Sequence, residues 1–238
     1  MTQRIAYRNR HLGQPPVSAS GHPAYPNRFA RFLLRAMKVE MGEMGLSAVM
    51  RIAWGDDEME RIPPNTLAKE FTFESLSALN RALDTYYDAD SGGARVGRGM
   101  ALRVGRAWFY QGIKGFGALA GIETSKIAAL PSEARARLAL EALAHIFTHF
   151  SDQTSWLDES DRVFRFIIDP CAPAWGIQSD RPVCQMMVGL LQECVRWASG
   201  QDLLVRETNC RAVEGGACIF VINKQPLESL SADKPNGE

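Results

Sequence analysis

The sequence predicts an α+β fold in which helices pack on an antiparallel β-sheet. Helical periodicity dominates residues 27 to 150, whereas short β-favouring segments follow Asp152. Short turns join those segments in pairs, with one further helix between the pairs. A run of helices followed by closely linked strands is typical of an α+β domain. Because no repeat or internal boundary interrupts the pattern, we expect one domain over residues 27–226.

The first half of the chain is expected to be helical after a flexible start. Residues 1–26 are polar and hold four prolines, which predicts an N-terminal arm. Apolar residues from Phe29 to Met41 recur at helical intervals, with Asn27 as a potential N-cap and Gly45 as a stop. A short apolar segment at 46–54 and an exposed loop at 55–65 follow.

Three further helices are expected before the strands. Thr72 and Ser75 resemble a capping box ahead of a helix whose apolar face reaches Tyr86. The glycine-rich residues 92–121 keep helical spacing, which predicts a long helix whose glycines allow a neighbouring backbone to approach closely. Pro131 is suited to the first turn of the next helix, which runs to Phe150.

The second half is expected to contain two hairpins around one helix. Residues 154–160 and 162–169 favour β-structure on either side of a polar turn. Residues 181–199 return to helical period, with Pro182 near the start and Gly200 just past the end. Residues 203–210 and 217–222 predict the second hairpin. Residues 227–238 are expected to be a polar tail.

Composition excludes several classes of function. Lys plus Arg and Asp plus Glu each total 27, so no net charge attracts nucleic acid or an anionic membrane. The chain has neither a secretory signal nor the roughly 18–20 apolar residues that cross a bilayer. We therefore expect a cytoplasmic protein without membrane insertion. A reducing cytoplasm disfavours disulfides among the five cysteines.

Three potential metal ligands lie close together in the second expected hairpin. Glu207, Cys210 and Cys218 are separated by two and by seven residues, and a glycine pair lies between the cysteines. A zinc site requires about four ligands, usually thiolates, imidazoles or a carboxylate. The fourth ligand must therefore come from another part of the chain. The candidates are Cys171, Cys184, Cys194, His145 and His149.

Cys184 is the best candidate for the fourth position. It lies in the first turn of an expected helix, where the helix dipole favours a thiolate. Cys194 falls on the apolar stripe of that helix, and Cys171 follows a strand without a CxxC partner. From the residues alone two alternatives stay open: a metal site, or core thiols beside a solvated Glu207.

The order of Cys184, Glu207, Cys210 and Cys218, followed by "FVINKQP", resembles the 4-vinyl-reductase domain. This family is a small-molecule-binding module that also serves as the sensory domain of bacterial phenol- and hydrocarbon-responsive transcription activators. The resemblance is clearest over residues 130–226. It implies that these four residues bind zinc, that the chain forms a homodimer, and that the fold is similar to a vesicle-tethering subunit with a buried ligand cavity. Four protein ligands leave no open position, so the zinc would be structural.

The expected ligand site is an apolar pocket between helices and sheet, with a few polar anchors. Aromatic side chains would form its walls and a histidine would supply an anchor, although each aromatic residue could equally fill the core. The candidates are Trp108, His145, Phe147, His149, Phe164 and Phe166.

The sequence thus predicts a binding module for an aromatic, hydrocarbon or tetrapyrrole molecule, with a separate partner for any signalling output. The family name implies an alternative, a vinyl reductase or accessory factor in bacteriochlorophyll formation. Reduction needs an electron donor, and the sequence has no flavin, nicotinamide or iron–sulfur signature. A scaffold without a ligand is a third alternative, which rests on fold analogy.

Overall fold

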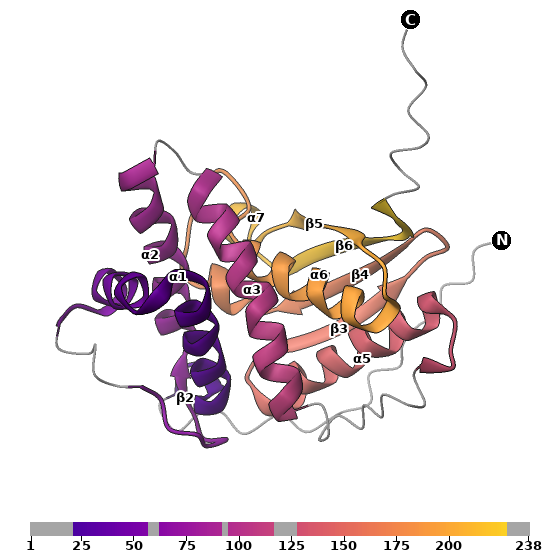
Figure 1. The fold of residues 1–238 in the computed structure, drawn as a ribbon, viewed down its shortest axis with the longest axis horizontal. Helices are drawn as coiled ribbons and strands as arrows, with labels where there is room; N and C mark the ends of the chain where they lie inside the picture. Colours follow the sequence, from indigo (N-terminus) through magenta and orange to yellow (C-terminus); the bar gives the residue numbers. More distant parts are fainter. Residues whose placement is uncertain (1–20, 57–61, 92–94, 117–127, 228–238) are drawn as a thin grey trace, which may run out of the picture.

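A four-stranded antiparallel sheet lies at one end of the molecule, and helices cover one of its faces (Figure 1). The computed structural model describes residues 21–56, 62–91, 95–116 and 128–227. The larger sheet has the strand order β3-β4-β6-β5 and consists of β3 (Thr154–Glu159), β4 (Val163–Asp169), β5 (Leu203–Asn209) and β6 (Cys218–Pro226). The predicted α+β class and both predicted hairpins are confirmed.

The helices come from both halves of the chain. Helices α5 and α6 contact β3 and β5, respectively, while α1, α2 and α3 pack beyond them, with α3 lying against α6 (Figure 1). The helical elements are α1 (Asn27–Trp54), α2 (Phe73–Ser91), α3 (Arg95–Phe116), α5 (Ser132–Phe150), η2 (Ala172–Ala174), α6 (Gln185–Ser199) and α7 (Arg211–Glu214). No helix within the described ranges is long and apolar enough to span a bilayer.

Helix α1 continues beyond the predicted stop at Gly45. The break lies instead at Gly42, whose φ of 73° and ψ of 179° are non-helical, and the helix resumes and runs to Trp54. A glycine accepts this positive φ without the steric cost of a Cβ, so the chain bends and continues. The predicted stop at Gly45 was therefore wrong, and residues 46–54 are the second part of the same helix.

A small second sheet joins the start of the domain to the loop before α2. Strand β1 (Ala24–Pro26) pairs antiparallel with β2 (Lys69–Thr72). Strand β1 lies inside residues 1–26, which the sequence predicts to be a flexible arm. Tyr25 is fully buried, with its ring centroid 5.2 Å from Phe73 and 5.9 Å from Phe147. The ordered domain thus begins before Asn27. Residues 1–20 and 228–238 of the expected arm and tail lie outside the described residues.

Two sequence signals have the predicted structural roles. The Thr72 side chain accepts a hydrogen bond from the backbone N–H of Ser75 at 3.2 Å, which caps α2. Gly105 of α3 and Gly189 of α6 allow the two helix backbones to touch. A Cβ on Gly105 would lie 1.9 Å from the carbonyl oxygen of Met186, and one on Gly189 would lie 2.0 Å from that of Leu102.

The inner face of the larger sheet forms the core beneath the helices. Alternate residues of the central strands, including Phe164 and Phe166 of β4 and Phe220 of β6, are fully buried. Strand residues alternate between the two faces of a sheet, so their neighbours point to the more exposed outer face. One end of this sheet carries the turns that follow β4 and β5 and the start of β6, and these turns form the candidate metal centre.

Candidate metal centre and ligand cavity

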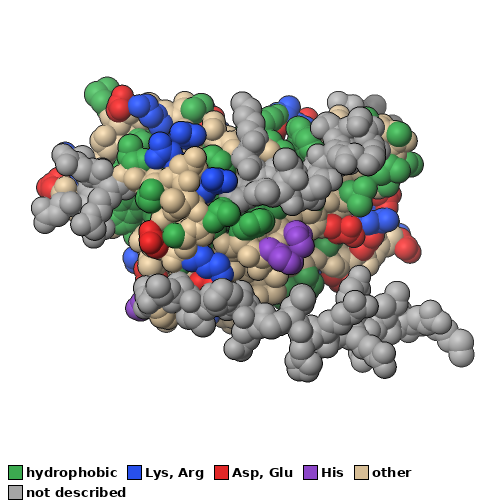
Figure 2. Space-filling model, turned by 90° about the horizontal axis from the view of Figure 1, so that it is seen from below, with side chains coloured by type: hydrophobic (Ala, Val, Ile, Leu, Met, Phe, Trp, Pro, Cys, Tyr) green, Lys and Arg blue, Asp and Glu red, His purple; other side chains and the backbone are tan. Residues whose placement is uncertain are grey.

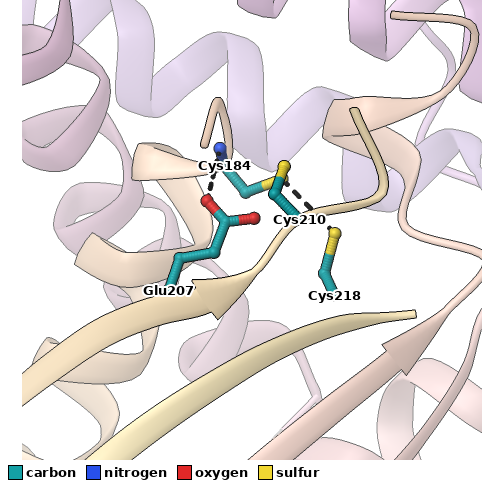
Figure 3. A group of neighbouring side chains, drawn as sticks. All are labelled: Cys184, Glu207, Cys210 and Cys218. Atoms are coloured by element: carbon teal, nitrogen blue, oxygen red, sulfur yellow. Dashed lines mark hydrogen bonds between the residues drawn. The ribbon is translucent and has the colours of Figure 1, made fainter. Parts of the chain in front are cut away.

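The structure brings together the four residues that the sequence predicts to bind zinc. Cys184 directly precedes α6, Glu207 lies on β5, Cys210 lies between β5 and α7, and Cys218 begins β6. Their side chains point toward one another (Figure 3). One ligand atom from each residue lies within 4.8 Å of the other three. Residues far apart in sequence therefore meet at one point, and their role as metal ligands stays a prediction.

The spacing of the sulfur atoms fits a tetrahedral zinc ion. The Sγ atom of Cys184 lies 4.0 Å from that of Cys210 and 3.8 Å from that of Cys218. Two thiolates bound to one tetrahedral zinc at about 2.3 Å would have their sulfurs about 3.8 Å apart. All three cysteines are buried, which excludes water as a competing ligand. The two sulfur separations from Cys184 are therefore compatible with thiolates on one tetrahedral zinc ion.

The Glu207 carboxylate supports the same interpretation. Its Oε2 atom accepts a hydrogen bond from the backbone N–H of Cys184 at 3.0 Å, whereas Oε1 is buried without a hydrogen-bond partner among the described residues. A buried polar atom without a partner is costly and calls for an explanation. A metal ion bound between this oxygen and the three sulfurs would satisfy it.

Burial and the neighbouring acidic groups shift the protonation of the cluster. Burial and the nearby Cys210 raise the pKa of Glu207 to about 8. Burial, reinforced by hydrogen bonds with the surrounding thiols, also raises the pKa of Cys184. The described residues thus gather acidic groups that resist carrying several negative charges at once. A bound divalent cation would supply the opposing charge, with release of the protons that the ligands carry.

A buried amide from α2 ties two loops of the metal centre together. The Nδ2 atom of Asn80 donates hydrogen bonds to the carbonyl oxygens of Pro173 at 3.1 Å and Val183 at 3.0 Å. These carbonyls lie close to Cys171 and Cys184 in sequence, and Asn80 is only 3% exposed. Sequence reasoning missed this residue, although an amide beside the apolar stripe of α2 was a visible signal.

Replacing Asn80 with leucine is expected to destabilise the fold and weaken metal binding. Leucine is similar in size but leaves the buried carbonyl of Pro173 and the part-buried carbonyl of Val183 without this donor, at about 1–3 kcal/mol for a buried unsatisfied group. Chemical denaturation and zinc titration measure the two effects. Ser77→Ala is the matched control, because Ser77 is also buried on α2 but donates to Glu74 of its own helix. Equal unfolding curves for the two variants would contradict the role of Asn80.

An apolar cavity of about 50 Å³ lies between α1, α3, α5 and α6. Trp108 and Phe147, two of the predicted ligand-binding residues, contribute to its wall. Phe164 and Phe166 do not line this cavity, because they are buried on the inner face of the sheet. The full lining is Phe29, Trp108, Phe109, Gly112, Ile113, Leu143, Ile146, Phe147 and Leu190.

The two predicted histidine anchors do not line this cavity. His145 and His149 are exposed on α5 and contact each other, with ring centroids 3.7 Å apart. Figure 2 shows histidine side chains at the molecular surface. Partial burial, together with the neighbouring His149, lowers the pKa of His145, so His145 resists protonation. Helical spacing placed the two rings side by side as expected, but on the face of α5 that points to solvent.

One protein family matches the second half of this chain. The family model that matches this chain covers residues 164–224, a range that contains Cys184, Glu207, Cys210 and Cys218. Residues 164–224 match the V4R domain. The match confirms the resemblance that the sequence suggested, and the V4R segment (residues 164–224) also contains Cys171. Trp108 and Phe147 lie outside it. No curated protein matches the chain.

Several solved structures align with most of the chain. The phenol-responsive sensory domain of the transcription activator PoxR, with phenol, is 18% identical over 68% of this chain and 82% of that chain, with a TM-score of 0.44. An H-NOX protein from S. oneidensis in the Fe(II)NO ligation state is 10% identical over 84% and 99%, with a TM-score of 0.50. A protein from a study of heme redox potential modulated by porphyrin distortion is 9% identical over 83% and 99%, with a TM-score of 0.52. The last two similarities concern the fold.

Proposed function

We propose that the protein is a small-molecule-binding module in which a structural zinc ion fastens the β5–β6 hairpin to the start of α6. The observation that carries this proposal is the convergence of three buried thiols and one carboxylate within 4.8 Å of one another, inside the V4R segment. Four protein ligands complete a tetrahedral shell and leave no position for substrate. Thiolate ligands persist in a reducing compartment, so we propose that the protein functions in the cytoplasm.

The proposed ligand is a compact aromatic or hydrocarbon molecule that enters between α1, α3, α5 and α6. Support comes from the almost entirely apolar lining of the cavity there, which includes Trp108 and Phe147. The cavity of about 50 Å³ would not hold a benzene ring, for which a cavity of about 150 Å³ suffices. Binding therefore requires side chains to move apart. A tetrapyrrole would need a far larger opening, so we favour a single-ring ligand.

The small volume of this cavity also favours a second candidate function, a scaffold without a ligand. In that case the aromatic residues around Tyr25 serve only as a packed core. Homodimerisation and a separate signalling partner, which the family resemblance implies, are compatible with both candidates and stay predictions. Direct measurement of binding separates the two functions.

Filling the cavity from Gly112 is expected to weaken ligand binding without destabilising the protein. Gly112 lines the cavity, and a Cβ at this position would meet nothing within 4 Å. We expect Gly112→Leu to weaken binding of phenol or toluene at least about 10-fold, and to gain up to about 1 kcal/mol of helix propensity. Isothermal titration calorimetry and thermal unfolding measure the two quantities.

The matched control is Gly99→Leu, which makes the same change on the same helix. Gly99 is exposed and also has open space around its Cβ position, but it does not line the cavity. This variant is expected to bind the probes like the wild type. If neither the wild type nor Gly99→Leu binds a single-ring probe, the scaffold function is preferred. Equal binding by all three proteins would place the ligand elsewhere.

A further inference from the structure

A fifth buried thiol touches the proposed metal centre. The Sγ atom of Cys171 lies 3.7 Å from the Sγ atom of Cys184, and both residues are fully buried. Cys171 is therefore in direct contact with one of the four expected ligands. The family resemblance gives it no role, and the sequence placed it behind Cys184 as a candidate ligand.

The Sγ atom of Cys171 lies as close to the Sγ atom of Cys184 as the sulfurs of the expected ligands do. Cys184 has three sulfur neighbours, at 3.7 Å for Cys171, 4.0 Å for Cys210 and 3.8 Å for Cys218. Each value is close to the separation of about 3.8 Å between two thiolates on one tetrahedral zinc ion. Cys171 is not one of the four residues whose ligand atoms all lie within 4.8 Å of one another, but it offers a fifth donor in contact with one of them.

The fold distinguishes Glu207 from the four thiols. Glu207 lies on β5, the edge strand of the sheet, next to a register shift between Glu207 and Asn209. Cys171 follows the central strand β4, whose Ile168 pairs with Cys218, and the loop after it is held by Asn80. The carboxylate is therefore the donor on an edge strand, whereas Cys171 lies on the turn that follows a central strand and contacts Cys184.

We propose that Cys171 is a reserve metal ligand, which binds the metal together with Cys184, Cys210 and Cys218 when Glu207 leaves. This inference rests on the proposed zinc site and adds a second coordination state to it, Cys₄ in place of Cys₃Glu. The exchange allows the Glu207 side chain to leave the metal without loss of the ion, while Cys210 keeps the end of β5 attached. Soft thiolate ligands suit zinc at least as well as a carboxylate does.

The exchange balances in protons and charge. On binding the metal, the sulfur of Cys171 would give up its S–H proton, and the departing Glu207 carboxylate would accept that proton. One anionic ligand replaces another, so the net charge of the buried centre does not change. No oxidant or reductant takes part, and no disulfide forms.

The test compares Glu207→Ala, Cys171→Ser and the double variant in the full chain, kept under reductant. Zinc affinity is measured by competition with a chelator, and Co²⁺ replaces zinc for spectroscopy, because each bound thiolate adds sulfur-to-cobalt charge-transfer absorption. Cys194→Ser is the control, since Cys194 is buried on α6 but is not part of the cluster. Circular dichroism checks that each variant is folded.

Glu207→Ala is expected to keep its metal within about 10-fold of wild-type affinity, whereas the double variant loses at least about 100-fold. The charge-transfer absorption per cobalt should rise by about one third in Glu207→Ala, as three thiolates become four. Cys171→Ser should show the wild-type spectrum but release zinc to a chelator about 10-fold faster. This rate measurement does not depend on the folding of Glu207→Ala.

Three results would overturn the reserve role. Glu207→Ala could lose as much affinity as the double variant, or it could bind cobalt with an unchanged charge-transfer intensity. Cys171→Ser could also release zinc at the same rate as the wild type and the Cys194→Ser control. These outcomes leave the proposed zinc site intact. If the wild type itself binds neither zinc nor Co²⁺, the metal site fails first, and the inference fails with it.

Discussion

The Cys210→Ser variant is expected to purify without zinc and to lose most of its stability, whereas the wild type carries about one zinc ion per chain. A hydroxyl is a poor zinc ligand, and Cys210 links the end of β5 to the cluster. Structural zinc supplies an apparent binding free energy of about 10–16 kcal/mol in zinc-finger peptides. Even a fraction of this is large beside the roughly 5–15 kcal/mol that stabilises a typical domain. Metal analysis and thermal unfolding provide the measurements.

The control for this variant is Cys194→Ser. Burial raises the pKa of Cys194 well above its ordinary value, so this side chain acts as a neutral, packed thiol. Its replacement is expected to cost about 1–3 kcal/mol for burying a hydroxyl, with no change in zinc content. A wild type that remains folded and metal-free after supply of zinc would refute the structural role of the metal.

The Gly105→Ala variant is expected to lose at least about 3 kcal/mol of unfolding free energy, at the upper end of the cost of overpacking a core. The added Cβ would lie 1.9 Å from the carbonyl oxygen of Met186 and 2.9 Å from the backbone nitrogen of Leu190. Backbone atoms cannot rotate away as a side chain can. Helices α3 and α6 would therefore have to separate, and α6 directly follows the proposed zinc ligand Cys184.

The matched control for Gly105 is Gly99→Ala on the same helix. A Cβ at Gly99 meets nothing within 4 Å, so alanine should stabilise α3 by up to about 1 kcal/mol. The two alanine variants thus differ in the sign of their effect on the unfolding free energy, which urea denaturation reports. If Gly105→Ala were as stable as Gly99→Ala, the close contact between α3 and α6 would be refuted.

The long elements were predictable because their patterns repeat over many residues. The apolar periodicity of α5 and α6, together with the two hairpins, predicts the fold class. Strand β1 was not predictable in this way, since three residues from Ala24 to Pro26 are too few to show a period. Its formation depends on pairing with β2 and on burial of Tyr25, which are tertiary effects.

The donor set of the metal centre was also visible in the sequence, but its geometry was not. Spacing around the glycine pair identified Cys210 and Cys218, and the helix position favoured Cys184. The contact between Cys171 and Cys184 depends on how the turn after β4 lies against the start of α6, which no local pattern encodes. The solvent-facing orientation of His145 likewise depends on which side of α5 meets the sheet.

The hydrogen bonds of Asn80 set a limit on transplanting the V4R segment. Asn80 lies on α2, outside residues 164–224, yet it holds the carbonyls of Pro173 and Val183 that lie inside them. An excised fragment would carry every thiol and the carboxylate but lack the brace between two of its loops. A chimaera that joins this segment to a different N-terminal half would therefore need an amide donor at the equivalent position to keep the thiols in place.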